Sequence, residues 1–250
     1  MLVKDMGNID ELEVIYKTSM FCIKKIKMKK LEKIADLGEG MRESVIITLD
    51  GKIKITADYL NYSIELDKKD VCYLPVHNSF EIIKLSQEAF IIIAEAFTNK
   101  YFSPYVKRFK EMPCFKSGLP PYQRLVYVAI GEQDKADHFL VGYTEGLRGN
   151  WTSWPPHKHD DKPEVFIYYG MSDGYGLQML VTDRKEEIYK VEDGDALIIE
   201  KGYHHNVAIP SCGINYLWII YAESHNRNLN VKVHPKFKEV PIGETHMRLS

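Results

Sequence analysis

The stretch that decides the fold is GNWTSWPPHKHDDKPE, residues 149–164. In an extended strand, side chains two residues apart point to the same face, so His157 and His159 lie side by side and the lysine between them faces away. Two imidazoles at that spacing can hold one metal ion. Turn-forming aspartates and a proline follow, and Glu164 opens the next strand. We expect a hairpin return to bring its carboxylate beside the two histidines.

A further ligand is expected from a neighbouring strand. The sequence GYHH at residues 202–205 follows the apolar run 196–199 and offers two adjacent histidines, of which only one can point into a barrel. Residues alone leave His204 and His205 as alternatives. A set of nitrogen and oxygen donors without a thiolate suits zinc, manganese, iron, nickel or cobalt, and does not select among them.

The rest of the chain predicts an all-β protein. Most segments show two-residue alternation or short β-branched runs, which are typical of strands. Asp50-Gly51 between residues 45–49 and 52–56 predicts a hairpin, because this dipeptide tolerates the positive φ of a tight turn. Further strands are expected at residues 64–66, 71–74, 80–85, 90–96, 125–130, 139–144, 165–169, 176–182, 188–191, 196–199 and 216–222.

The chain divides into two halves. Residues 103–122 contain four prolines and a glycine among polar residues and are interpreted as a linker. Each half carries an acidic turn before an apolar strand, LDKKDV at 66–71 and VEDGDA at 191–196. These features predict two tandem β-barrels, residues 1–110 and 111–250, of which only the second carries the paired histidines.

Composition narrows the function classes. The 250 residues hold 33 Lys+Arg and 35 Asp+Glu, for a net charge of -2, and 45% are hydrophobic. That balance is typical of a globular protein and gives no overall field to attract nucleic acid or an anionic membrane. The N-terminus lacks a basic-then-apolar secretory layout, so a cytoplasmic protein is expected. The four cysteines form no CxxC pair and are expected to be buried, reduced thiols.

The two histidine-bearing stretches resemble the two motifs of the cupin superfamily. More narrowly, GNWTSWPPHKHD (149–160), QMLVTDR (178–184), VEDGDALII (191–199) and GYH (202–204) are similar to the 5-deoxy-glucuronate isomerase family of inositol catabolism. The strand PEVFIYY (163–169) also resembles the related 5-keto-4-deoxyuronate isomerases of pectin breakdown. The similarity is strongest from about residue 139 to residue 222.

The resemblance implies a bicupin of two jelly-roll barrels, with a degenerate first barrel and one divalent metal in the second. By motif position the ligands would be His157, His159, Glu164 and His204, whereas the generic cupin spacing would select His205. The implied reaction is isomerisation of 5-deoxy-D-glucuronate to 2-deoxy-5-keto-D-gluconate. The alternatives are a 5-keto-4-deoxyuronate isomerase, a cupin dioxygenase and a non-catalytic sugar-acid-binding bicupin. A homo-oligomer is also implied.

An aldose-ketose isomerase must move a proton between adjacent carbons while an enediolate oxygen is stabilised. Besides Glu164, the polar candidates for this chemistry are Glu145, Tyr168 and Gln178. The expected partner is a small sugar acid, whose carboxylate Arg184 could bind by a two-pronged contact, with Lys158 as a second cation.

Overall fold

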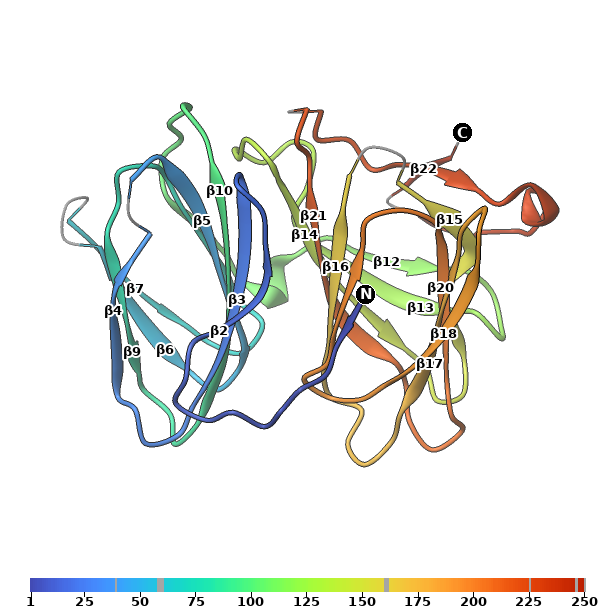
Figure 1. The fold of residues 1–250 in the computed structure, drawn as a ribbon, viewed down its shortest axis with the longest axis horizontal. Coiled ribbons are helices and arrows are strands. Elements are labelled where there is room, and N and C mark those ends of the chain that lie inside the picture. The colour runs from blue at the N-terminus through green and yellow to red at the C-terminus, as the bar shows by residue number, and fades with distance from the viewer. Residues whose placement is uncertain (39, 58–60, 160–161, 225, 246, 250) are drawn as a thin grey trace. The chain divides into compact units, whose positions relative to one another are not determined.

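The computed structural model describes residues 1–38, 40–57, 61–159, 162–224, 226–245 and 247–249. These residues form strands joined by loops and two short 3-10 helices, η2 (Phe109–Glu111) and η3 (Pro235–Phe237), with no α-helix among them (Figure 1). The predicted all-β class is confirmed. Within the same described part of the chain, no helix is long and apolar enough to cross a bilayer.

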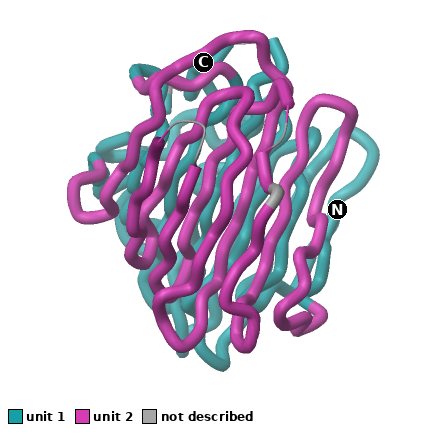
Figure 2. Tube along the Cα trace, turned by 90° about the vertical axis from the view of Figure 1, so that its left-hand side faces the viewer, with its two compact units in different colours: residues 1–5, 113–133, 138–250 teal, residues 6–112, 134–137 magenta. Residues whose placement is uncertain are grey.

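Two compact units make up the chain (Figure 2). The N-terminal unit comprises residues 6–112 and 134–137, and the C-terminal unit comprises residues 1–5, 113–133 and 138–250. Residues 1–5 belong to the C-terminal unit because the Met1 ammonium donates a hydrogen bond to the Ile198 carbonyl at 2.6 Å, and the short strand that follows pairs there. The predicted linker is not irregular throughout, because both of its ends contain strands.

The N-terminal unit packs a six-stranded sheet against a four-stranded sheet, with an isoleucine-rich core between them. In sheet order, the first contains β11 (Tyr105–Lys107), β8 (Val71–Leu74), β5 (Arg42–Asp50), β10 (Ala89–Phe97), β3 (Phe21–Met28) and β2 (Glu13–Lys17). The second contains β4 (Lys33–Leu37), β9 (Phe80–Lys84), β6 (Ile53–Ala57) and β7 (Tyr62–Leu66).

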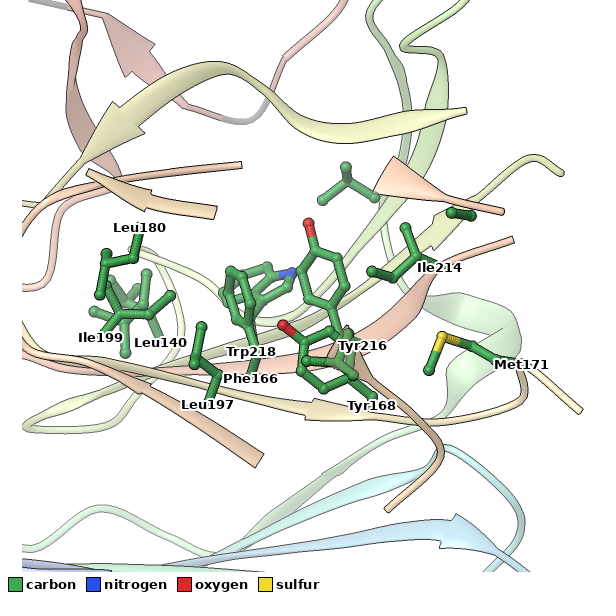
Figure 3. Close-up of a cluster of buried hydrophobic side chains, with 14 of the residues drawn as sticks. Leu140, Phe166, Tyr168, Met171, Leu180, Leu197, Ile199, Ile214, Tyr216 and Trp218 are labelled. Atoms are coloured by element: carbon green, nitrogen blue, oxygen red, sulfur yellow. The ribbon is translucent and has the colours of Figure 1, made fainter. Parts of the chain in front are cut away.

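The C-terminal unit packs a seven-stranded sheet against a six-stranded sheet, and its core is rich in aromatic residues (Figure 3). The first sheet contains β1 (Leu2–Val3), β19 (Ala196–Ile199), β16 (Glu164–Tyr168), β21 (Asn215–Tyr221), β14 (Phe139–Gly146), β13 (Arg124–Ile130) and β12 (Cys114–Ser117). The second contains β18 (Glu186–Val191), β17 (Gly176–Val181), β20 (Tyr203–Ala208), β15 (Trp151–Lys158), β22 (Asn230–Val233) and β23 (Arg248–Leu249).

The two units repeat one topology. The order β8-β5-β10-β3-β2 in the first unit matches β19-β16-β21-β14-β13 in the second, and β4-β9-β6-β7 matches β15-β20-β17-β18. Consecutive strands such as β15 and β16 therefore alternate between facing sheets, as in a jelly roll. Each unit is thus a barrel of two sheets, as the sequence predicts.

Two local predictions are wrong. The strands on either side of Asp50-Gly51 exist, but β5 pairs with β10 and β8 whereas β6 pairs with β7 and β9, so they form no hairpin. Gly51 has φ +80° and its Cα packs against the backbone around Glu88, so the chain crosses to the facing sheet there. Among the cysteines, Cys22, Cys72 and Cys212 are buried free thiols as expected, but Cys114 is exposed on the edge strand β12.

Candidate metal centre

Three histidines converge inside the C-terminal barrel. The neighbouring strands β15 and β20 pair His157 with His204, and the centroids of these two rings lie 4.5 Å apart. His159 follows directly after β15, and its ring centroid lies 5.8 Å from that of His157. One nitrogen from each ring lies within 4.8 Å of the other two. The side chains thus form a cluster that can hold a metal ion.

Glu164 completes this cluster from the facing sheet. Its Oε2 lies 3.2 Å from Nε2 of His204 and 3.6 Å from Nε2 of His159. Ligands bound at about 2.0–2.2 Å to one ion lie roughly 3–3.5 Å apart, so these separations suit a shared metal. The expected hairpin return does not occur, because β15 and β16 belong to different sheets. The carboxylate instead reaches the histidines across the interior of the barrel.

Strand alternation separates the two adjacent histidines. Along β20 the residues alternate between half-buried and buried, and His204 is 1% exposed whereas His205 faces the other side of the sheet. There the His205 ring lies 5.8 Å from the ring of Trp151 and 5.4 Å from that of Trp154. His204 is therefore the member of the pair that the geometry offers to a metal.

The pKa values and the unpartnered polar atoms of the cluster favour the binding of a cation. Burial raises the pKa of Glu164 to about 8, lowers the pKa of His157 to about 4 and holds that of His204 well below its usual range. Glu164 Oε2 and both ring nitrogens of His204 have no hydrogen-bond partner. Buried polar atoms are normally satisfied, so this set fits a divalent cation that all four side chains would bind.

The environment of His157 orients its ring. Its Nδ1 lies 2.9 Å from the Pro155 carbonyl oxygen, which can only accept a hydrogen bond. The proton is therefore on Nδ1, and the lone pair of Nε2 is available inside the barrel. Metal-binding histidines commonly make this second contact, because it fixes the tautomer and the ring orientation.

A cavity of about 30 Å³ adjoins the cluster. Besides the four candidate ligands it is lined by polar, aromatic and aliphatic side chains and one methionine: Arg124, Thr144, Ser153, Phe166, Tyr216, Trp218, Val126, Ile220, Leu229 and Met247. Figure 3 shows Phe166, Tyr216 and Trp218 in the adjoining core. A volume of this size admits one or two water-sized ligands beside a metal ion.

Apart from Glu164, the polar residues that the sequence suggests for proton transfer, Glu145, Tyr168 and Gln178, lie outside the cavity lining. Tyr168 donates a 2.9 Å hydrogen bond to Gln178, which also accepts one from Asn206 at 2.8 Å, so these side chains form a buried network in the barrel interior. Glu145 accepts a hydrogen bond from Tyr169 at 3.1 Å. None of these residues lines the cavity. Their catalytic roles remain predictions.

Arg184 and Lys158 line a different space, a groove of about 790 Å³ that also borders His159. Arg184 is exposed, and the Lys158 ammonium lies 5.2 Å from the centroid of the Tyr203 ring. Arg124, Thr144, Ser153 and Tyr216 also line the cavity, and none of them belongs to the predicted ligand set. The one signal in the sequence was a cation, Arg124, directly before the apolar run 125–130.

The N-terminal unit has different residues at the equivalent positions. Where β15 and β20 pair His157 with His204, β4 and β9 pair Leu37 with Phe80, both of which are buried. Ser44 on β5 has the register position that Glu164 has on β16, because each pairs with the last residue of the matching neighbour strand. The metal-ligand pattern is thus specific to the second copy of the topology.

Comparison with known proteins assigns the family. The KduI/IolB family model matches residues 9–240. The chain belongs to the KduI/IolB family. A 5-deoxy-glucuronate isomerase from Shouchella clausii is 29% identical over 197 residues, which cover 71% of this chain and 72% of that relative.

Solved structures support the same fold. An IolB-like protein from Salmonella typhimurium LT2 superposes with a TM-score of 0.82 at 18% identity, covering 95% of this chain and 97% of that one. Oxalate decarboxylase from Bacillus subtilis, described with Mn(II) centres, gives a TM-score of 0.60 at 13% identity over 81% of this chain and 69% of that one. This KduI/IolB family member is therefore a bicupin, as the sequence predicts.

Proposed function

We propose that this KduI/IolB family member is a metal-dependent aldose-ketose isomerase of deoxyuronates, with 5-deoxy-D-glucuronate as its substrate and 2-deoxy-5-keto-D-gluconate as its product. The observation that carries the proposal is the buried cluster of His157, His159, His204 and Glu164 in a chain whose curated relatives are 5-deoxy-glucuronate isomerases. The reaction would place the protein in inositol catabolism.

The cluster fits what this reaction needs. A divalent metal bound by the four side chains would supply a Lewis acid that stabilises negative charge on adjacent carbonyl and hydroxyl oxygens. Phe166 and Trp218 form an apolar wall, which keeps water away from that charge and strengthens electrostatic contacts. The hydrogen bond from His157 to Pro155 keeps one imidazole oriented, so the site is preorganised before substrate binds.

Substrate binding requires the cavity to enlarge. About 30 Å³ is too little for a six-carbon acid, which needs the cavity of a small-molecule site. Of the residues that line it, Leu229 and Met247 belong to the C-terminal segment, and Met247 is half-buried and not part of a strand. We infer that these two side chains move aside when the sugar acid enters.

The test is direct. The purified protein is analysed for bound metals, then incubated with 5-deoxy-D-glucuronate while ketose formation is followed by ¹³C NMR, with and without a chelator. We expect turnover that the chelator abolishes and an added divalent metal restores. The His157→Ala variant should lose activity together with its metal, whereas His234→Ala, a control histidine on η3's N-terminal side, should retain both.

The alternative activities give different results in the same assay. Turnover of 5-keto-4-deoxyuronate and not of 5-deoxy-D-glucuronate would indicate an isomerase of pectin breakdown. Oxygen consumption with a sugar acid would indicate a dioxygenase. A metal-loaded protein that binds sugar acids and converts none of them would contradict the isomerase proposal and indicate a binding protein.

A further inference from the structure

Arg124, the first residue of β13, lines the metal-site cavity although it is charged and only 3% exposed. Its Nη1 donates hydrogen bonds to the Trp154 carbonyl oxygen at 2.8 Å and to the Tyr122 carbonyl oxygen at 3.3 Å. Arg124 lines this cavity together with His157 and Tyr216, and its charge adds to the burial that lowers the pKa of His157. The cation is thus fixed at the wall of the cavity.

Among the described residues, this guanidinium has no carboxylate partner. Throughout the described ranges no carboxylate makes an ion pair with Arg124, and both of its hydrogen bonds use Nη1 alone. A guanidinium carries five N–H donors, so those on Nε and Nη2 are left over. A buried charge without a partner is costly, and proteins normally pair it. The side chain therefore presents unused donors to the cavity, whose lining carboxylate, Glu164, makes no ion pair with it.

We propose that Arg124 binds the carboxylate of the sugar-acid substrate and so selects acids over neutral sugars. The inference rests on the proposed function. In that function the carbonyl end of the substrate faces the metal, and the carboxylate end is assigned to Arg124. Nε and Nη2 present two parallel N–H groups, which match the two oxygens of a carboxylate. The carboxylate of the substrate would supply the negative charge that pairs with the guanidinium.

The groove that His159 also lines offers competing cations: Lys158, Arg184, Lys185 and Lys201. The Arg184 side chain is exposed to solvent, so water and salt screen its attraction for an anion. Arg124 is buried at the wall of the cavity, where solvent screens the same contact less. Arg184 is consequently the competing candidate for the carboxylate: it is the same residue type and lines a groove that His159 also lines, but its side chain is exposed.

The experiment compares Arg124→Gln, Arg124→Lys and Arg184→Gln in the metal-loaded full chain. The thermal midpoint and the metal content are measured first. Binding of D-gluconate, an unreactive acid, and of D-glucitol, its neutral counterpart, is then measured by calorimetry, and kcat and KM are measured with 5-deoxy-D-glucuronate. The lysine variant keeps the charge and one hydrogen-bond donor group, so it covers the case in which Arg124→Gln fails to fold.

We expect Arg124→Gln to weaken D-gluconate binding and raise KM by about 100-fold, as expected for losing a buried charge-assisted pair, while D-glucitol binding and metal content stay unchanged. Arg124→Lys should lie between this variant and the wild type, and Arg184→Gln should change each value less than about threefold. A purely structural role would weaken binding of the acid and the neutral compound alike.

The inference is overturned if folded, metal-loaded Arg124→Gln or Arg124→Lys binds D-gluconate as tightly as the wild type, or if Arg184→Gln shows the larger loss. It is also overturned if the wild type binds no sugar acid. The two proposals fail separately. Acid binding that depends on Arg124 without any isomerisation contradicts only the isomerase, whereas isomerisation with an unchanged KM in Arg124→Gln contradicts only the role of Arg124.

Discussion

His204 and His205 provide the sharpest test of the candidate metal centre, because they are adjacent in sequence and face opposite sides of one sheet. His204 is 1% exposed and lies against His157, whereas His205 packs beside Trp154 on the outer face. Replacing each histidine by alanine removes the same atoms from the same strand. Only the His204→Ala change removes an atom from the proposed ligand set.

The expected loss of metal affinity in His204→Ala follows from the number of ligands. A four-ligand zinc site binds with about 10–16 kcal/mol, so one ligand accounts for about 3 kcal/mol, or roughly 100-fold in affinity. At a metal concentration about 1,000 times the wild-type dissociation constant, bound metal stabilises the fold by about 4 kcal/mol. A 100-fold loss reduces this to about 1.4 kcal/mol. With about 2–4 °C per kcal/mol, the metal-induced rise in Tm should fall by roughly 5–11 °C in His204→Ala.

The assay is a thermal melt with and without added metal, together with elemental analysis of the dialysed protein. The His205→Ala variant should keep the full metal-induced shift, although its Tm without metal falls slightly because contacts with the tryptophans are lost. Equal losses of the shift in the two variants would refute the reasoning from strand alternation. So would a loss confined to His205→Ala.

Three further changes test the packing around the site and in the first barrel. The Gly142→Ala variant should lose about 1–3 kcal/mol in a denaturant melt, because the added methyl would overlap the Trp218 ring. Gln178→Leu strands two buried hydrogen-bond donors and should cost about 2–5 kcal/mol by the same measurement, with metal content unchanged. In the N-terminal unit, Lys24 makes a 2.5 Å ion pair with the buried Glu95. Lys24→Met alone should cost about 3–5 kcal/mol, and adding Glu95→Gln, which removes the buried charge and keeps an acceptor for the Gly38 N–H, should recover most of it. A double variant no more stable than the single one would contradict this account.

The sequence was sufficient for the parts of the site that depend on local geometry. The spacing of His157 and His159 places both rings on one face of any strand, and the alternation around residues 139–222 indicates paired strands wherever they lie. The resemblance of four short motifs to the 5-deoxy-glucuronate isomerases led to the KduI/IolB family that the comparisons establish. Strand alternation and sequence motifs depend only on residues that are close in sequence. Both can therefore be recognised without knowing the tertiary structure.

Pairing between distant residues could not be predicted in this way. Asp50-Gly51 has the chemistry of a hairpin turn, yet the strands on either side of it belong to facing sheets. A crossing of the same kind, between β15 and β16, places Glu164 opposite the histidines across the interior of the second barrel, which chain order alone does not predict. Which strands become neighbours depends on how two sheets bury their apolar faces, and that is a property of the whole barrel.

The sequence by itself therefore determined the fold class, the family and the paired histidines. Only the tertiary structure decided that His204 faces inward, that Gln178 and Tyr168 lie in a separate network, and that Arg124 borders the cavity. The physical reason is that strand spacing sets the face of a side chain relative to its neighbours in sequence. Which face is interior, and which distant residues share it, is set by the packing of the two sheets.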